Sequence, residues 1–132
     1  MKQMKNHVKV KPVSANRMFG RKGKTTFKTA EYVAYQNEVR DDILGSEWIF
    51  GTSQVAFEIV VGLSNRGADI DNILKPLLDT YQGIFEEFND NKVYHLDVTK
   101  TIVKKGDEFI DVTVKEYIEN AEDNNKKDDS DD

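Results

Sequence analysis

Residues 55–63 restrict the fold more than any other part of the sequence. Apolar side chains at every second position would project to one side of an extended chain: Val55, Phe57, Ile59, Val61 and Leu63. A period of two is typical of a β-strand with one face in a hydrophobic core. Two polar residues and a glycine at 65–67 then break the pattern and predict a turn. We therefore expect a buried strand that ends at about Leu63.

A helix is expected directly after this turn. Apolar residues recur there at three- and four-residue spacing, at Ile73, Leu74, Leu77 and Leu78. Pro76 falls early enough that its missing N–H costs little, and Gly83 is expected to help end the helix. The pattern predicts a helix from about Asn72 to Tyr81, with Asp69 and Asp71 in the preceding turn.

Acidic residues and a lysine gather around this predicted turn, followed by Asn89 and Asp90 after a short connection. Mg²⁺ prefers oxygen ligands and is usually held by one or two carboxylates together with substrate phosphate. Asp69, Asp71 and Asp90 can supply such ligands. Lys75, four residues after Asp71, would share its helix face and point toward the metal. Asp and Asn are also preferred at helix N-termini, so the residues alone leave a capping role open.

The remaining sequence predicts further strands and a second helix within residues 1–118. A short strand is expected to end at Pro12, and a polar loop to run from Ser14 to Lys24. Thr29 can cap a helix to about Leu44, with an apolar stripe of Tyr32, Tyr35, Val39 and Ile43. Residues 93–103 and 109–117 are expected to form a hairpin around a turn at 104–107.

Charge is distributed very unevenly along the chain. Residues 1–28 hold nine lysines and arginines and no acidic residue. Residues 119–132 hold seven acidic residues and two lysines, which accounts for the whole net charge of -5. The hydrophilic tail is expected to be disordered. The basic segment is typical of a surface that contacts phosphate backbones, although basic termini can also be simply solvated.

Several classes of site are disfavoured by the sequence. There is no cysteine, so disulfides and thiolate metal sites are excluded. No apolar run approaches the roughly 20 residues that span a bilayer, and we expect a soluble, cytoplasmic protein with no membrane partner. The segment Gly20–Thr25 resembles the end of a nucleotide-binding loop, but Met18 replaces its first glycine; no nucleotide cofactor is expected. An EF-hand match fails because Leu74 replaces the required glycine.

The pattern Asp69-x-Asp71-Asn72-x-x-Lys75-x-x-x-Asp79 resembles the D-x-D-N-x-x-K-x-x-x-D signature of the RusA family of Holliday junction resolvases, found largely in bacteriophages and prophages. Asp90-x-x-Val93 resembles the end of the family's second acidic element, and Lys100 its later basic residue. Pro12 with Asn16-Arg17, Lys28-Thr29-Ala30-Glu31 and Tyr35 are similar to the family's arm and first helix. The resemblance spans about residues 8–117.

The resemblance implies a small α+β domain over residues 1–118, with a mixed sheet and two main helices. It also implies a homodimer that introduces paired, symmetric nicks into four-way DNA junctions during recombination and repair. It implies that Asp69, Asp71 and Asp90 bind Mg²⁺, or Mn²⁺ in its place, and that Lys75 assists at the phosphate. The residues expected to contact branched DNA are Asn16, Arg17, Arg21, Lys22, Lys24, Lys28 and Lys100.

One position departs from the family's pattern. The chain has Asn89-Asp90 where the family usually has two aspartates. Asn89 can offer an oxygen but no charge, so we expect weaker metal binding rather than lost activity. The alternative is a protein that keeps the fold and binds branched DNA without cutting it.

Overall fold

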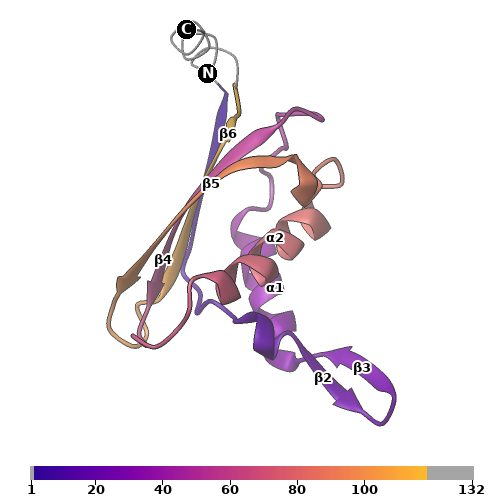
Figure 1. The fold of residues 1–132 in the computed structure, drawn as a ribbon, viewed down its shortest axis with the longest axis vertical. Helices are drawn as coiled ribbons and strands as arrows, with labels where there is room; N and C mark the ends of the chain where they lie inside the picture. Colours follow the sequence, from indigo (N-terminus) through magenta and orange to yellow (C-terminus); the bar gives the residue numbers. More distant parts are fainter. Residues whose placement is uncertain (1, 119–132) are drawn as a thin grey trace, which may run out of the picture.

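The computed structural model describes residues 2–118, which form a four-stranded sheet with two helices packed on one face and a separate two-stranded hairpin (Figure 1). This confirms the predicted α+β class with a mixed sheet and two main helices. In chain order the elements are β1 (Gln3–Val8), η1 (Ala15–Arg17), β2 (Phe19–Lys22), β3 (Thr25–Lys28), α1 (Ala30–Asp42), β4 (Val55–Leu63), α2 (Asp71–Ile84), η2 (Asp90–Lys92), β5 (Val93–Ile102) and β6 (Phe109–Glu116).

Strand β4 lies inside the sheet, whose strand order is β1-β6-β4-β5. It pairs in parallel with β5 and antiparallel with β6. A parallel pair needs a crossover connection, which α2 supplies. The predicted hairpin of residues 93–103 and 109–117 is therefore wrong, because β4 separates the two strands. The apolar β4 gains burial by having both edges paired, whereas β5 is exposed along most of its length and forms the edge.

The connection from β5 to β6 passes the end of β4 and is tied to it. The backbone N–H of Val103 donates to the carbonyl of Leu63 at 2.9 Å, and the Ser64 hydroxyl donates to the Glu108 carboxylate at 2.7 Å. The predicted turn at 104–107 is present, closed by a 2.9 Å hydrogen bond from Asp107 N to Lys104 O. These contacts fix the C-terminal end of β4, where the loop to α2 begins.

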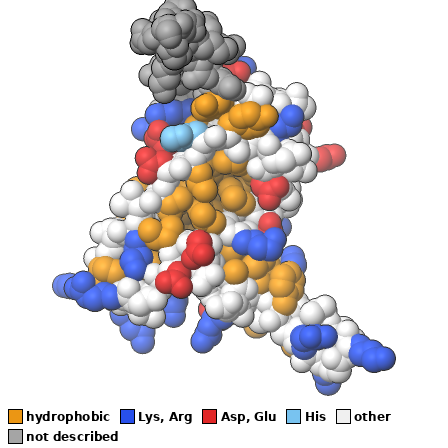
Figure 2. All heavy atoms as spheres, viewed as in Figure 1, with side chains coloured by type: hydrophobic (Ala, Val, Ile, Leu, Met, Phe, Trp, Pro, Cys, Tyr) orange, Lys and Arg blue, Asp and Glu red, His pale blue; other side chains and the backbone are white. Residues whose placement is uncertain are grey.

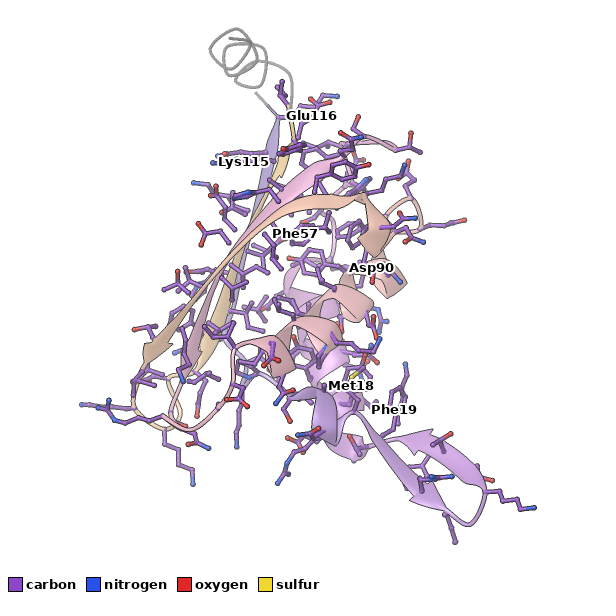
Figure 3. All side chains as sticks on the ribbon, viewed as in Figure 1. Met18, Phe19, Phe57, Asp90, Lys115 and Glu116 are labelled. Carbon is purple, nitrogen blue, oxygen red and sulfur yellow. The ribbon has the colours of Figure 1, made fainter. Side chains whose placement is uncertain are left out.

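The core lies between the sheet and the two helices. The predicted stripe of α1 is confirmed, since Tyr32, Tyr35, Val39 and Ile43 are all buried. Phe57 of β4 is fully buried, and its ring lies 5.7 Å from that of Tyr81 and 5.4 Å from that of Phe88, between centroids (Figure 3). The Tyr81 hydroxyl is hydrogen-bonded to Asn6 at 2.7 Å, which links α2 to β1.

The helix boundaries agree with the predictions within a few residues. The Thr29 hydroxyl accepts from the Tyr32 N–H at 3.1 Å and caps α1 as predicted. Helix α2 begins at Asp71 rather than Asn72 and continues to Ile84, so Gly83 lies in its last turn and does not end it. The first strand ends at Val8, several residues before Pro12.

The prediction of a polar loop from Ser14 to Lys24 is wrong for most of this segment. Residues 15–17 form η1, and β2 and β3 pair as an antiparallel hairpin that stands away from the body (Figure 1). Gly23, with φ of 63°, occupies the first position of a two-residue loop, where glycine is favoured in type II′ hairpins. Threonine and phenylalanine favour the strands on either side.

Among residues 2–118, no helix is long and apolar enough to cross a membrane. The acidic segment 119–132, for which we expect disorder, lies outside the described residues.

Replacing Phe57 by alanine should strongly destabilise the protein. The substitution removes a buried ring between Tyr81 and Phe88, and such truncations cost about 3–5 kcal/mol. Urea unfolding followed by circular dichroism measures this loss. Val33→Ala on the exposed side of α1 is the control and should change stability by less than about 0.5 kcal/mol. Equal effects of the two substitutions would contradict the assigned core.

Candidate functional site

The loop between β4 and α2 is held in place by a lysine from the neighbouring strand. Lys100 of β5 lies beside Val61 of β4. Its ammonium group donates to the carbonyl of Arg66 at 2.9 Å and to that of Ala68 at 2.8 Å. This lysine, expected from the sequence to contact DNA, thus binds the backbone directly before Asp69. A lysine that fixes this loop also fixes where the following carboxylates begin.

Asp69 and Asp71 lie at the N-terminal end of α2 and are both exposed. The N-cap position is Ile70, and no side chain caps the helix. Neither carboxylate forms an ion pair with any of residues 2–118. Asp71 suits the positive end of the helix dipole, but capping does not account for the two acids together. They remain free to accept a cation.

Asp90 is the first residue of η2 and lies beside the other end of α2. Its backbone N–H donates to the Gln82 side chain at 2.6 Å, which places it beside the C-terminal half of α2 (Figure 3). The path from Asp71 to Gln82 along the helix axis is about 16 Å. Within the described residues, no group of three acidic or histidine side chains is arranged to hold a metal ion. The structure thus brings Asp69 and Asp71 together and leaves Asp90 apart.

Asn89 has a structural role that the sequence did not reveal. Its side-chain oxygen accepts from the Asn91 N–H at 3.1 Å and caps η2. An aspartate could form the same cap. The departure from the family's pattern at this position is therefore compatible with the local fold, and the amide oxygen is already in use.

Lys75 forms an ion pair with Asp79, one helical turn further along α2, at 3.1 Å. This hydrogen bond and the charge of Asp79 raise the pKa of Lys75, with a smaller contribution from Asp90. The prediction that Lys75 points toward a metal site stays a prediction, since in the structure its ammonium group is paired with Asp79. Asp79 is the last residue of the RusA-like sequence pattern, yet its role as the partner of Lys75 was not predicted. The i, i+4 spacing was the signal that could have indicated it.

Residues 9–18, between β1 and β2, form the N-terminal arm of the domain. A groove of about 310 Å³ runs beside Asp69, between this arm and the acidic turn. The arm contributes Ser14 and Asn16, and the other wall includes Asn65, Asp69 and Asn72. The structure therefore brings together Asn16 and Asp69, which are far apart in the sequence. Asn72 was recognised only as part of the pattern, and its place in the groove depends on tertiary packing.

Apart from Lys100, the predicted DNA-contacting cations fall into two groups. Arg17 pairs with Glu31 at 3.2 Å, and Lys28 donates to Gln36 at 2.9 Å, so both lie against α1. The other three project from the hairpin, fully in solvent and without an ion pair among the described residues: Arg21, Lys22 and Lys24. Figure 2 shows this end of the molecule with Lys and Arg side chains and no acidic side chain on the visible face.

The donors near Asp69 suit a hard cation. Two exposed carboxylates separated by one residue provide the one or two protein ligands that Mg²⁺ usually takes, with water and phosphate oxygens completing its shell. Asp69 and Asp71 are thus the residues that fit such an ion, whereas Asp90 of η2 forms no three-residue ligand group with them among residues 2–118.

Comparison of the chain with models of known protein families gives no match, and comparison with curated protein sequences gives no significant match either.

Lys100→Met should loosen the loop before Asp69 without unfolding the sheet. Removing the ammonium leaves the carbonyls of Arg66 and Ala68 without this donor, at a cost of about 1 kcal/mol. Amide hydrogen exchange measured by NMR should become faster at residues 66–69. Lys104→Met, in the exposed turn after β5, is the matched control. Unchanged exchange in Lys100→Met would show that the lysine does not hold the loop.

Proposed function

We propose that this protein is a Mg²⁺-dependent endodeoxyribonuclease that cuts four-way DNA junctions by paired, symmetric nicks. The observation that carries the proposal is the pair of exposed carboxylates at the start of α2. Asp69 follows the loop fixed by Lys100 and lines a groove shared with the arm, and Asp71 is in the first turn of the helix. The RusA-like spacing of these acids with Lys75 and Asp79 supports the same reaction. We also propose RusA family membership on this basis.

Asp69 and Asp71 are the residues that would hold the metal in this proposal. A bound Mg²⁺ polarises a phosphoryl oxygen and lowers the pKa of a coordinated water. The protein's own contribution is to keep both acids in place: the acidic loop is held by Lys100, and Asp71 is part of a helix that is packed on the core. Without a cation between them, these carboxylates would repel a DNA phosphate.

Lys75 supplies the positive charge that can neutralise phosphate oxygens. Its neighbours Asp79 and Asp90 raise its pKa, so the ammonium group stays charged at neutral pH. Because Lys75 is exposed and paired only at the surface, a phosphate oxygen can compete with Asp79 for it. Lys75 lies one turn after Asp71 on α2. In this proposal Asp90, in η2, contributes through the effect of its charge on Lys75.

The arm and the hairpin would position the DNA. Cations that contact phosphates provide affinity without reading sequence, and those on the hairpin have no acidic neighbour in the segment 17–28. We propose that the protein acts as a homodimer, because a four-way junction cut at two matching points suits an enzyme with two-fold symmetry. Two copies would each place one acidic pair at one strand.

Cleavage of a labelled four-way junction tests the proposal directly. The wild type should nick the junction symmetrically in Mg²⁺ and leave a linear duplex of the same sequence intact. Asp71→Asn should lower the cleavage rate by at least about a hundredfold, since it removes one of two metal-binding charges. Asp42→Asn at the end of α1 is the control and should cut normally. Junction cleavage that persists in Asp71→Asn would refute the assigned site.

A second candidate function is binding of branched DNA without cleavage. The separation of Asp90 from Asp69 and Asp71 favours it, because a nuclease that needs all three acids in one cluster would be inactive in this arrangement. Tight junction binding with no cleavage in either Mg²⁺ or Mn²⁺ would establish this function and exclude the nuclease.

Asn89→Asp distinguishes a two-carboxylate site from a larger one. Aspartate preserves the cap of η2, so the fold should not change. Residue 89 is the N-cap of η2 and is not one of the two proposed ligands, so Mg²⁺ affinity should change by less than about twofold if Asp69 and Asp71 alone hold the ion, whereas the family's pattern predicts tighter binding with aspartate. Titration calorimetry of the two proteins measures this. Clearly tighter binding in Asn89→Asp would mean that the Asp90 segment belongs to the metal site.

A further inference from the structure

The two faces of the β2–β3 hairpin differ in what they contact. In an antiparallel pair, residues directly opposite each other project to the same side, and consecutive residues project to opposite sides. One face therefore carries the pairs Phe19↔Lys28 and Arg21↔Thr26, and the other carries Gly20↔Phe27 and Lys22↔Thr25.

The first face is anchored to helix α1. The Phe19 ring meets the Tyr32 ring edge-on, with 6.0 Å between centroids. The Lys28 ammonium lies 5.6 Å above the same ring and donates to Gln36. Figure 3 shows Phe19 at the root of the hairpin. These contacts explain why an aromatic residue is useful at position 19.

The second face carries an aromatic ring with no comparable anchor. Phe27 is 48% exposed, and no other aromatic ring of residues 2–118 stacks on it. Its ring lies against Gly20, where an added Cβ would stand only 2.7 Å from the ring's tip. Glycine at position 20 thus makes room for the ring on the hairpin and leaves its outer side open. The ring covers this glycine across the hairpin, a cross-strand contact that contributes to stability, while the rest of the ring stays exposed.

The surroundings of Phe27 match the chemistry of nucleic-acid bases. Lys22 shares its face, and Arg21 and Lys24 are exposed nearby without an acidic residue in the hairpin. A cationic surface with an aromatic ring is the usual platform for exposed bases, since the cations follow the backbone and the ring stacks on the base. In an intact duplex every base is already stacked on both sides. Such a ring can therefore gain a partner only where the duplex is interrupted.

We infer that Phe27 stacks on an unstacked DNA base at the branch point of the substrate. The inference rests on the proposed function for the branched DNA and deepens it, because it assigns the recognition of branching to the hairpin rather than to the acidic turn. Gly20 acts as a positioning residue that lets the ring present its open side.

Binding measured in EDTA, where no metal-dependent cleavage occurs, tests this inference. Phe27→Ala should weaken affinity for a four-way junction by between about fivefold and about a hundredfold, the range for loss of one base–aromatic stack. Affinity for a linear duplex of the same sequence should not change. Phe27→Trp should bind the junction like the wild type, whereas Phe27→Leu, which keeps an apolar side chain without a π face, should behave like Phe27→Ala. Tyr94→Leu, which removes an exposed aromatic ring of β5 outside the hairpin, is the control and should bind both DNAs normally.

Gly20→Ala gives an independent test that keeps the phenylalanine. The added methyl group would displace the tip of the Phe27 ring, which is the flexible end of a side chain, so the melting temperature should be unchanged. Junction affinity should fall toward that of Phe27→Ala. A 2-aminopurine base at the branch point should show a fluorescence change on binding of wild type that is reduced in both variants.

Three results would overturn the inference: equal loss of junction and duplex binding in Phe27→Ala, wild-type junction binding by Phe27→Leu, or a lower molecular mass of Phe27→Ala in sedimentation. The last would mean that the ring packs on a second copy of the chain. The outcomes separate this inference from the nuclease. Wild-type protein that binds the junction but leaves it uncut excludes the nuclease alone, whereas a wild type that cuts and a Phe27→Ala that binds normally exclude the stacking role alone.

Discussion

The parallel pairing of β4 with β5 is the constraint on which the rest of the structure depends. Two parallel strands cannot be joined by a tight turn, so the chain must cross over between them, and α2 is that crossover. The loop that leaves β4 therefore begins at one end of the sheet, and η2 delivers the chain to β5 at the other. This places the acidic turn and Asp90 at different positions along one helix. The same pairing brings Lys100 beside Val61, from which it reaches the loop carbonyls.

The proposed site combines a rigid base with exposed ligands. The acidic loop is held by a lysine from the neighbouring strand, and Asp71 is built into a helix whose buried side chains pack on the core. The carboxylates themselves are left without protein partners, as a site for an incoming cation requires. The β2–β3 hairpin is arranged in a similar way. One of its faces is anchored to α1, and the other face exposes cations and Phe27. In both places the anchored contacts hold exposed groups in position.

The sequence predicted those parts of the fold that depend on local patterns. The alternation of residues 55–63, the stripe from Tyr32 to Ile43 and the Thr29 cap all follow from short-range periodicity and backbone hydrogen bonding, and the structure confirms them. The pairing of residues 93–103 with 109–117 was wrong, since adjacency in sequence favours a hairpin but burial of β4 favours two flanking strands. The hairpin at 19–28 was not predicted, because its cations indicate a polar loop and outweigh the strand-forming threonines and phenylalanines. For the site, spacing identified Asp69, Asp71 and Lys75, but the positions of Lys100 and Gln82 depend on contacts between distant segments.

The proposed function depends on a divalent ion that binds at the turn held by Lys100, through Asp69 and Asp71. Paramagnetic broadening of backbone amide signals by a small amount of Mn²⁺ locates such an ion directly, because the effect falls steeply with distance. We predict that broadening is strongest at residues 69–72, is much weaker at 89–91, and disappears from 69–72 in Asp69→Asn combined with Asp71→Asn. Broadening centred on residues 89–91, or none at residues 69–72, would contradict the account.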